Sequence, residues 1–404
     1  MRKLLAGFLI GVFLGSLLFV YGLPNPNNGS GVLAPPIAPS LSVSKVQFSN
    51  STAFMITGRG GLALDPSLLT SELKLIASKY GGNMHVLALP VNEKGTVIVG
   101  YGVKFFKDGR VAVKVVRTPV SKLNLISPNM ITENLKSWVR EKPYFHPDIK
   151  ATPMGMPKGY EAKTINVKTG QESTMVGTSS GPYWHDFGPV EDQLIDPPYG
   201  NIYMVYHVWG LRNDGNPNRE WIAVAGDGTT GLANSYYRIE PGIELRNYFG
   251  DKDYKNFKTK EAVISHKWDL DSSLSPVLGA VNPTTMPGEE TLTMGVGAEG
   301  ASISYTVVIP DEEIISYTDG VNPQADWVLK FNTDSECAKT TFSTMVGSVA
   351  SFNQKVLQDG KWHKIVEVDF KVTFERSYTE YLIIQKTEDY TVSMGMVWLL
   401  KVGS

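Results

Sequence analysis

A hydrophobic run near the N-terminus, residues 4–22, constrains this chain more than any other feature. The run has no charged residue and approaches the about 20 apolar residues that a membrane-spanning helix needs, whereas a signal-peptide core needs only about 7–15. Arg2 and Lys3 precede it, and the next basic residue is Lys45. The positive-inside rule therefore predicts a cytoplasmic N-terminus and an exported body.

Residues 1–22 have two interpretations. The length of the run favours a retained transmembrane anchor. In the second interpretation it is a signal segment, with Val20, Tyr21 and Gly22 before a cut at Leu23, although a clear Ala-x-Ala pattern is missing. The expected localisation is a single-pass membrane protein with its body outside, or a secreted protein if the chain is cleaved before Leu23.

Three glycines in the run, Gly7, Gly11 and Gly15, are spaced four residues apart. On a helix they share one face, and small residues at this spacing let two membrane helices approach closely. The pattern predicts a homodimer through this face. Glycine is also common in membrane spans without any such role, and that is the alternative.

Composition limits the classes of protein and partner. The formal charge is −2 and only 19% of the 404 residues are charged, so we expect no nucleic-acid partner. Cys337 is the only cysteine, which excludes a disulfide within one chain. We expect it to be a buried thiol, and a bond between chains is the alternative. Glycosylation sequons begin at Asn28 and Asn50.

The chain after the anchor divides into three predicted parts. Residues 23–44 form a proline-rich tether, and residues 45–150 form a small α+β domain. In that domain Asp65 and Pro66 begin a helix that Gly81 ends, and an Asp-Gly turn at Gly109 joins two strands. A second helix carries the apolar residues Ile131, Leu135, Trp138 and Val139.

Residues 160–404 are predicted to be mainly β, beyond a proline-rich break at residues 144–159. Residues 202–211 are apolar on both faces, while residues 303–309 and 366–374 alternate between apolar and polar. One helix is expected around residues 342–349, and Asp359-Gly360 predicts a hairpin. The expected fold is an antiparallel β-sandwich of jelly-roll type, preceded by the α+β unit and the N-terminal segment.

Aromatic residues crowd one part of the predicted body. Exposed aromatic rings bind sugars and protein partners, whereas buried ones fill a core, and we expect most of these to be core with one or two at a rim. The candidate residues for binding a carbohydrate or protein ligand are Trp184, His185, Tyr206, Trp209 and Trp221.

Oxygen-bearing side chains alternate along a loop after residue 213. Asp214, Asn216, Asn218 and Glu220 are candidate calcium ligands, because Ca²⁺ prefers several oxygens. Arg219 stands where an EF-hand needs glycine, so that motif is excluded. A polar turn is the alternative, and calcium is the only cofactor that the sequence suggests.

Catalytic signals are weak. Residues 177–181 match G-x-S-x-G around Ser179, but no helical pattern follows, as a nucleophile elbow requires. The histidines show no H-x-x-x-H zinc spacing. A carboxylate-based hydrolase would use acidic pairs. The candidate carboxylates are Asp186, Glu191, Asp192, Asp269 and Asp271.

The sequence therefore favours a membrane-anchored extracellular or cell-envelope protein with a noncatalytic binding or structural role and an aromatic-rich β body. An exported hydrolase acting on carbohydrate or peptide is one alternative, and a secreted assembly protein is another. A hydrolase should have a concave pocket with converging carboxylates or histidines, whereas a binding module should lack one.

Retention of the anchor gives the first testable prediction. The full-length protein should sediment with membranes and resist alkaline extraction, because a spanning helix holds it in the bilayer. Membrane fractionation followed by N-terminal sequencing checks this. A mature chain that begins at Leu23 in the soluble fraction would refute retention.

Overall fold

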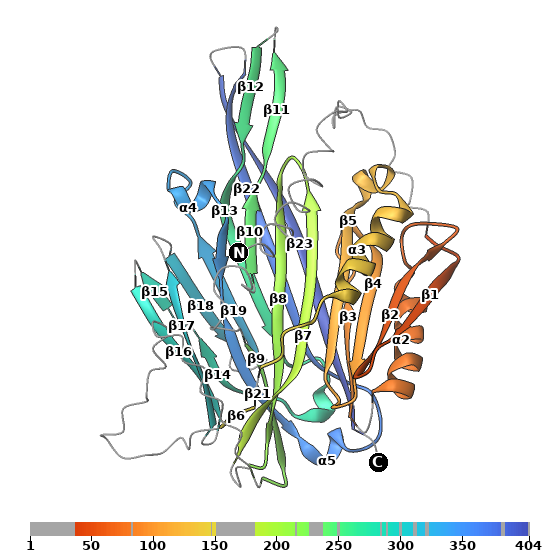
Figure 1. Cartoon of the computed structure of the whole chain (residues 1–404). Coiled ribbons are helices and arrows are strands. Elements are labelled where there is room, and N and C mark those ends of the chain that lie inside the picture. Colours follow the sequence, from red (N-terminus) through yellow and green to blue (C-terminus); the bar gives the residue numbers. More distant parts are fainter. Residues whose placement is uncertain are drawn as a thin grey trace. The chain divides into compact units, whose positions relative to one another are not determined.

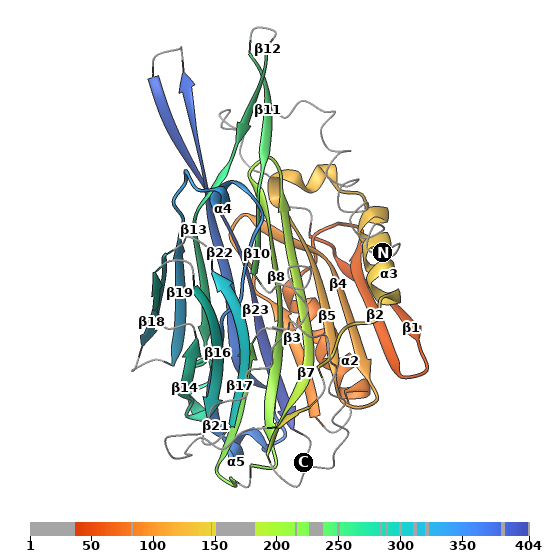
Figure 2. The same cartoon turned by 60° about the vertical axis from the view of Figure 1, so that its left-hand side comes forward.

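The computed structural model describes most of the body (Figures 1 and 2). The described residues are 37–81, 84–146, 148–150, 182–214, 216–225, 237–248, 251–282, 285–287, 290–298, 301–309, 313–319, 323–380 and 384–402. Four features of the sequence lie outside the described residues: the predicted anchor with its glycine face, most of the tether, the sequon at Asn28 and the G-x-S-x-G motif around Ser179. Within the described ranges, no helix is both long and apolar enough to cross a membrane.

The described residues are mainly in β-strands, which confirms the prediction of a mainly β protein. Twelve strands form the first large sheet: β1 (Ser40–Gln47), β2 (Ser51–Arg59), β4 (Thr96–Phe106), β5 (Val111–Pro119), β6 (Ile149–Lys150), β7 (Tyr183–Asp196), β8 (Gly200–Arg212), β9 (Arg219–Ala225), β10 (Tyr237–Pro241), β14 (Val277–Asn282), β20 (Phe342–Thr344) and β21 (Gly347–Asn353). Its main hydrogen-bonded order is β1-β2-β4-β5-β7-β8-β9-β21-β14.

The second large sheet has seven strands, in the order β15-β18-β19-β13-β22-β23-β3. Their bounds are β3 (Met84–Pro90), β13 (Lys258–Lys267), β15 (Thr285–Pro287), β18 (Glu313–Asp319), β19 (Gln324–Lys330), β22 (His363–Glu380) and β23 (Ile384–Val402). Two separate two-stranded hairpins are β11 (Ile243–Tyr248) with β12 (Asp251–Asn256), and β16 (Glu290–Ala298) with β17 (Ala301–Ile309).

Two longer helices form where the sequence predicts them. The bounds of the helices are α2 (Pro66–Tyr80), α3 (Pro128–Arg140), α4 (Glu336–Lys339) and α5 (Gln354–Leu357), with 3₁₀ turns η2 (Val120–Leu125) and η5 (Ser272–Leu274). Asp65 caps α2 by accepting from the backbone N–H groups of Ser67 and Leu68. Helix α3 lies on β4, where a Cβ at Gly102 would stand only 2.7 Å from the Trp138 ring. Glycine at that position therefore lets the helix approach the sheet.

Strands that precede and strands that follow the predicted break at residues 144–159 belong to the same sheets. Strand β5 pairs in parallel with β7, and β3 pairs with β23 near the C-terminus. Strands from both predicted domains therefore share both large sheets, because long-range ladders join segments that the prolines separate along the chain. A jelly-roll connectivity stays a prediction.

Two local predictions are wrong. The segment expected to be a helix around residues 342–349 forms β20 and the start of β21. Strand β21 pairs with β9 on one side and β14 on the other, so tertiary hydrogen bonding overrides a helical pattern of apolar residues. Gly360 makes a turn at φ 76°, but it joins α5 to β22 instead of two strands of a hairpin.

Both large sheets contribute to one hydrophobic core. Alternate residues of β22 are buried as predicted, including Val368, Phe370 and Phe374. They join Tyr206 and Trp209 from β8 of the first sheet in the same core. The Trp398 indole N–H also donates to the Tyr206 hydroxyl at 3.0 Å, which links β23 to β8.

A buried ion pair connects the sheets at a second place. Arg117 of β5 binds Asp192 of β7 at 2.7 Å, and both side chains are buried. The guanidinium also donates to the carbonyl oxygens of Val91 and Gly395, each at 2.6 Å. Because Gly395 lies in β23, one side chain holds backbone from the second sheet against the first.

A buried carboxylate at the end of β7 makes a further link. Asp196 accepts a 2.6 Å hydrogen bond from the Tyr390 hydroxyl of β23, and its other oxygen has no hydrogen-bond partner among the described residues. Burial raises the pKa of Asp196 to about 6, while the Tyr390 bond lowers it. Burial likewise raises the pKa of Asp369 to about 6.

Removing the Arg117 charge should lower the unfolding free energy of the protein. In Arg117→Met the Asp192 carboxylate stays buried without its partner, which typically costs about 3–5 kcal/mol of unfolding free energy. Urea unfolding measures the loss. Lys136→Met is the control, since it breaks an exposed pair with Glu133 and should cost less than about 1 kcal/mol. Equal effects of the two substitutions would contradict the role of Arg117.

The raised pKa of Asp196 predicts a pH dependence of stability. The folded state binds the proton more tightly than the unfolded state, whose aspartate pKa is about 3.9. The Asp196 contribution to the unfolding free energy should therefore fall as pH rises from about 4 to about 6. Asp196→Asn should lose less stability than the wild type between pH 4.5 and 7.5 in urea titrations. Asp389→Asn, at an exposed position, should behave like the wild type.

Candidate functional site

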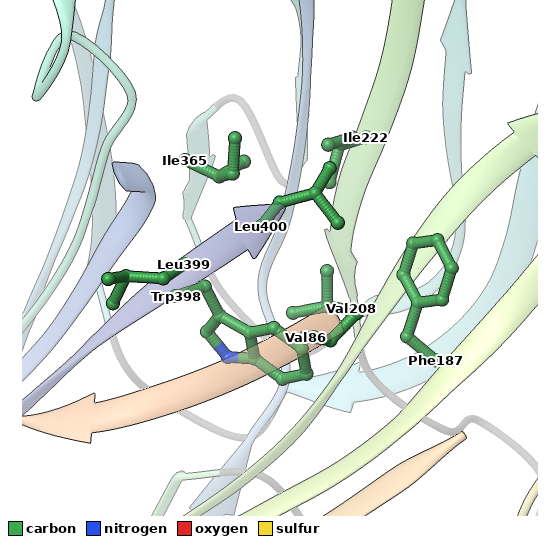
Figure 3. A pocket seen from close by; sticks show the side chains of 8 residues that line it. All are labelled: Val86, Phe187, Val208, Ile222, Ile365, Trp398, Leu399 and Leu400. Atoms are coloured by element: carbon green, nitrogen blue, oxygen red, sulfur yellow. The ribbon is translucent and has the colours of Figure 1, made fainter. Parts of the chain in front are cut away.

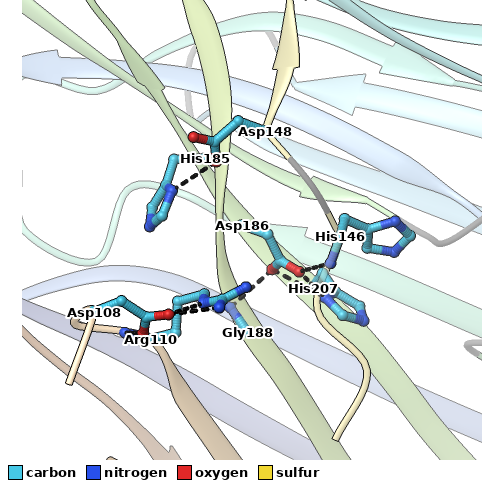
Figure 4. A network of polar contacts seen from close by, with 8 residues as sticks. All are labelled: Asp108, Arg110, His146, Asp148, His185, Asp186, Gly188 and His207. Atoms are coloured by element: carbon cyan, nitrogen blue, oxygen red, sulfur yellow. Dashed lines mark hydrogen bonds and ion pairs between the residues drawn. The ribbon is translucent and has the colours of Figure 1, made fainter. Parts of the chain in front are cut away.

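The strongest polar cluster in the described body surrounds Asp186 of β7 (Figure 4). Its carboxylate accepts hydrogen bonds from the backbone N–H of His146 at 2.9 Å and of Gly188 at 2.8 Å. The His207 ring places Nδ1 2.8 Å from Asp186 Oδ2. His146, Asp186 and His207 are 6%, 0% and 3% exposed, so solvent is almost excluded from this carboxylate and both imidazoles.

The backbone around Asp186 is shaped by a β-bulge. The register between β7 and β8 shifts between Asp186 and Gly188, which turns the Asp186 carboxylate toward its own strand's N–H at Gly188. Gly188 has φ +126°, a conformation that side chains rarely adopt. A Cβ there would also collide with the Val111 carbonyl oxygen and would stand 2.8 Å from the Phe145 ring.

Aromatic rings enclose the two histidines of the cluster. The His146 ring centroid lies 4.8 Å from that of His207, 4.8 Å from Tyr144 and 5.0 Å from Trp209. The His146 ring packs edge-to-face on Tyr144 and His207, with interplanar angles of 87° and 75°, and is tilted by 41° against Trp209. His185, one residue before Asp186, instead binds the exposed Asp148 at 2.9 Å on the outside of the cluster.

The predicted ligand-binding aromatics lie mostly in the core. Trp184, Tyr206, Trp209 and Trp221 are at most 7% exposed, which agrees with the core interpretation of this group. His185 is partly exposed. A binding role for these residues stays a prediction, and with four of the five buried, a ligand at the surface could meet His185 but not these four rings.

The predicted calcium loop forms turns between β8 and β9. Asp214 accepts from the backbone N–H of Asn216, and Asn216 accepts from those of Asn218 and Arg219. Glu220 makes an ion pair with Arg212 of β8. Oxygens of Asp214, Asn216 and Glu220 thus already bind protein groups, as in ordinary polar turns. Calcium binding stays a prediction.

Four of the five candidate hydrolase carboxylates have separate basic partners, and the fifth, Asp269, is exposed. Asp186 binds His207 and Asp192 binds Arg117. Glu191 binds Lys114 at 3.2 Å, and Asp271 binds His363 at 2.8 Å while capping η5. A carboxylate that already bonds its own basic partner has fewer oxygen lone pairs left to act on a substrate.

A hollow between the sheets is apolar (Figure 3). Its free volume is about 10 Å³, about the space of one water molecule, and its lining comes from β3, β7, β8, β9, β22 and β23. Phe187, Val208 and Trp398 are among the lining residues, and no carboxylate or histidine lines it. The hollow therefore lacks the converging titratable groups that a hydrolase site would need.

The hairpin β16–β17 is a second candidate site. It forms its own two-stranded sheet and lies near β14 and β21 of the first large sheet. The register pairs position 292 with 307, 294 with 305 and 296 with 303. All six positions hold apolar or aromatic residues, while the intervening pairs 293–306, 295–304 and 297–302 hold threonine, serine or glycine.

Comparisons with known proteins give only distant likenesses. No family model matches the chain, and no curated protein matches it. Similar solved structures include Clostridium perfringens delta-toxin, with 12% identity and a TM-score of 0.38 over 54% of this chain and 89% of that one. A pore forming protein has 9% identity and a TM-score of 0.32 over 52% and 91%. The Clostridium perfringens NetB toxin in its membrane-inserted form has 10% identity and a TM-score of 0.29 over 52% of this chain and 96% of that one. TM-scores this low carry no argument about function.

Sequence reasoning named Asp186 as a candidate carboxylate but did not predict that it would meet His146 and His207. His146 lies in the region interpreted as a domain break, 40 positions from Asp186, and His207 is 21 positions away on the next strand. No short motif can reveal such a group, because only the pairing of β7 with β8 and the return of residues 144–146 bring it together.

Gly188→Ala tests how strictly the bulge is required. It should lower the unfolding free energy by several kcal/mol, because it adds a backbone collision to the strain of positive φ. Gly109→Ala is the matched control: its φ is +89° with nothing within 4 Å, so only about 1–2 kcal/mol of strain is expected. Denaturant unfolding of both variants gives the comparison. Equal losses would contradict the close approach at Gly188.

Proposed function

We propose that this protein acts at a membrane without catalysis and that the hairpin β16–β17 is the part that enters the bilayer. The observation that carries the proposal is the register of the hairpin. Apolar positions pair with apolar positions and small polar positions with one another, from pair 292–307 to pair 297–302. A strand pair with one apolar and one polar face is what a bilayer-spanning β-structure needs.

Length and charge fit the same role. Each strand has nine residues, and a tilted strand needs about 9–11 to cross the hydrocarbon core. No residue of the two strands after Glu290 is charged, and Glu299 lies between them in the sequence. A charged turn can stay in water on the far side while the uncharged strands lie in lipid.

Insertion requires several copies of the chain. A single hairpin leaves unpaired N–H and C=O groups at both edges, and lipid supplies no partner for them. Hairpins from neighbouring copies can pair edge to edge and close into a ring, with the apolar face toward lipid and the polar face toward water. The proposed activity is therefore self-assembly at a membrane followed by permeabilisation.

The position of the hairpin supports a release step. Among the described residues it shares no ladder hydrogen bonds with either large sheet, although it lies beside β14 and β21. Leaving the body would cost packing contacts but no strand pairing. The body with its two sheets could keep its fold while the hairpin moves.

The other predicted roles remain proposals beside this one. A retained helix in residues 1–22, or dimerisation through Gly7, Gly11 and Gly15, would hold copies near a membrane. A carbohydrate or protein ligand would have to reach the body at partly exposed positions such as His185. The exported hydrolase is the second candidate function, but the separate basic partners of Asp186, Asp192 and Asp271 weigh against it.

Adjacent substitutions in β17 test the proposal. Ile303→Lys puts a charge on the apolar face, where lysine near the bilayer centre costs about 2–4 kcal/mol, and Ser304→Lys puts it on the polar face. Dye release from phosphatidylcholine–phosphatidylglycerol vesicles should fall at least about tenfold for Ile303→Lys. Ser304→Lys should keep release and shift ion selectivity toward anions in planar bilayers.

A labelling experiment covers the case in which Ile303→Lys fails to fold. In a Cys337→Ser background, a single cysteine at position 303 or 304 carries an environment-sensitive dye. Vesicles should raise the emission at 303 and not at 304, since alternate positions face opposite sides. Absence of release by the wild type, or equal responses at the two positions, would overturn the proposal.

A further inference from the structure

We propose that His146, Asp186 and His207 bind a divalent metal ion of the zinc class, a role independent of membrane insertion. Each residue offers one ligand atom, and these three atoms lie within 4.8 Å of one another. All three side chains are buried. Two imidazoles with one carboxylate form a ligand set that Zn²⁺ and similar first-row metals accept.

The three ligand atoms, which lie within 4.8 Å of one another, would have to rearrange to bind one ion. Zinc binds nitrogen or oxygen at about 2.0–2.2 Å, so ligand atoms in a tetrahedral site stand roughly 3.3 Å apart. His207 Nδ1 and Asp186 Oδ2 are already 2.8 Å apart, closer than two ligands of one ion. Binding would open this pair slightly and draw the His146 ring inward.

Proton balance at the site is simple. The hydrogen shared by His207 Nδ1 and the Asp186 carboxylate would be displaced, and the metal would occupy the space between the two atoms. A neutral His207 ring keeps its hydrogen, which moves to Nε2 so that Nδ1 can bind the metal, and no oxidation or reduction is involved. A water molecule can complete the tetrahedron, because three protein groups leave one position open.

The surroundings orient the carboxylate for this purpose. Asp186 keeps the N–H groups of His146 and Gly188 as donors, one to each oxygen. Such hydrogen bonds hold a metal-binding carboxylate in place, as outer contacts do in known metal sites. The bulge at Gly188 and the aromatic rings of Tyr144 and Trp209 limit how far the histidines can move.

The ion would link three segments that are distant in sequence. His146 precedes β6, Asp186 lies in β7 and His207 in β8. At most 6% of each side chain is exposed, so the ion would be structural: it would hold residues 144–146 on the first sheet and raise thermal stability.

The test uses the full chain without a histidine tag, stripped with EDTA and dialysed. Titration with Zn²⁺ alone should show one ion per chain and a raised melting temperature. Co²⁺ should give visible absorption bands of a tetrahedral nitrogen–oxygen site. His146→Gln and His207→Gln should each weaken Zn²⁺ binding at least about 100-fold. His185→Gln is the matched control, because it removes an adjacent histidine outside the cluster and should bind normally.

The outcomes decide whether His146, Asp186 and His207 form a metal site or a purely hydrogen-bonded structural cluster. Stoichiometric binding that the two cluster variants lose and His185→Gln keeps supports the proposal. If the variants do not fold, the wild type alone decides through its stoichiometry and Co²⁺ spectrum. Wild-type protein that binds no Zn²⁺, or binding that persists in both cluster variants, overturns the proposal.

Discussion

The buried charge of Arg117 is the constraint on which the two-sheet body depends. A guanidinium without water needs its charge balanced and its N–H groups bonded. Asp192 supplies the balancing negative charge, and the carbonyl oxygens of Val91 and Gly395 accept hydrogen bonds from further N–H groups of Arg117. Since these partners come from three separate parts of the chain, the sheets can close only in the arrangement that brings them together.

Other polar contacts in the core follow the same rule. His266 of β13 lies between the Tyr237 hydroxyl at 2.9 Å and the Ser348 hydroxyl at 2.8 Å, and Trp268 also donates to Ser348. Burial lowers the pKa of His266 to about 3, so its ring stays neutral. Such bonds join β10, β13 and β21. Because hydrogen bonds are directional and apolar contacts are not, they favour one alignment of the sheets over others.

Stability and proposed activity make different demands on this body. The core strands are joined by ladders, buried ion pairs and the cluster at Asp186, whereas in the part of the chain that the structure describes β16–β17 has no ladder to the large sheets. A protein that moves one hairpin into a membrane needs this difference, because the moving part must separate without unfolding the rest. A metal ion at His146, Asp186 and His207 would strengthen the part that stays.

The sequence by itself determined the local elements. Local patterns predict three elements: the cap at Asp65 predicts α2, the turn at Gly109 predicts the β4–β5 hairpin, and the alternation of residues 366–374 predicts β22. Each of these depends on interactions between residues that are close in the sequence. Tertiary structure decided the rest. Residues 342–349 became strands between β9 and β14, and Asp186 met His146 and His207, because pairing between distant segments has no signal in local spacing.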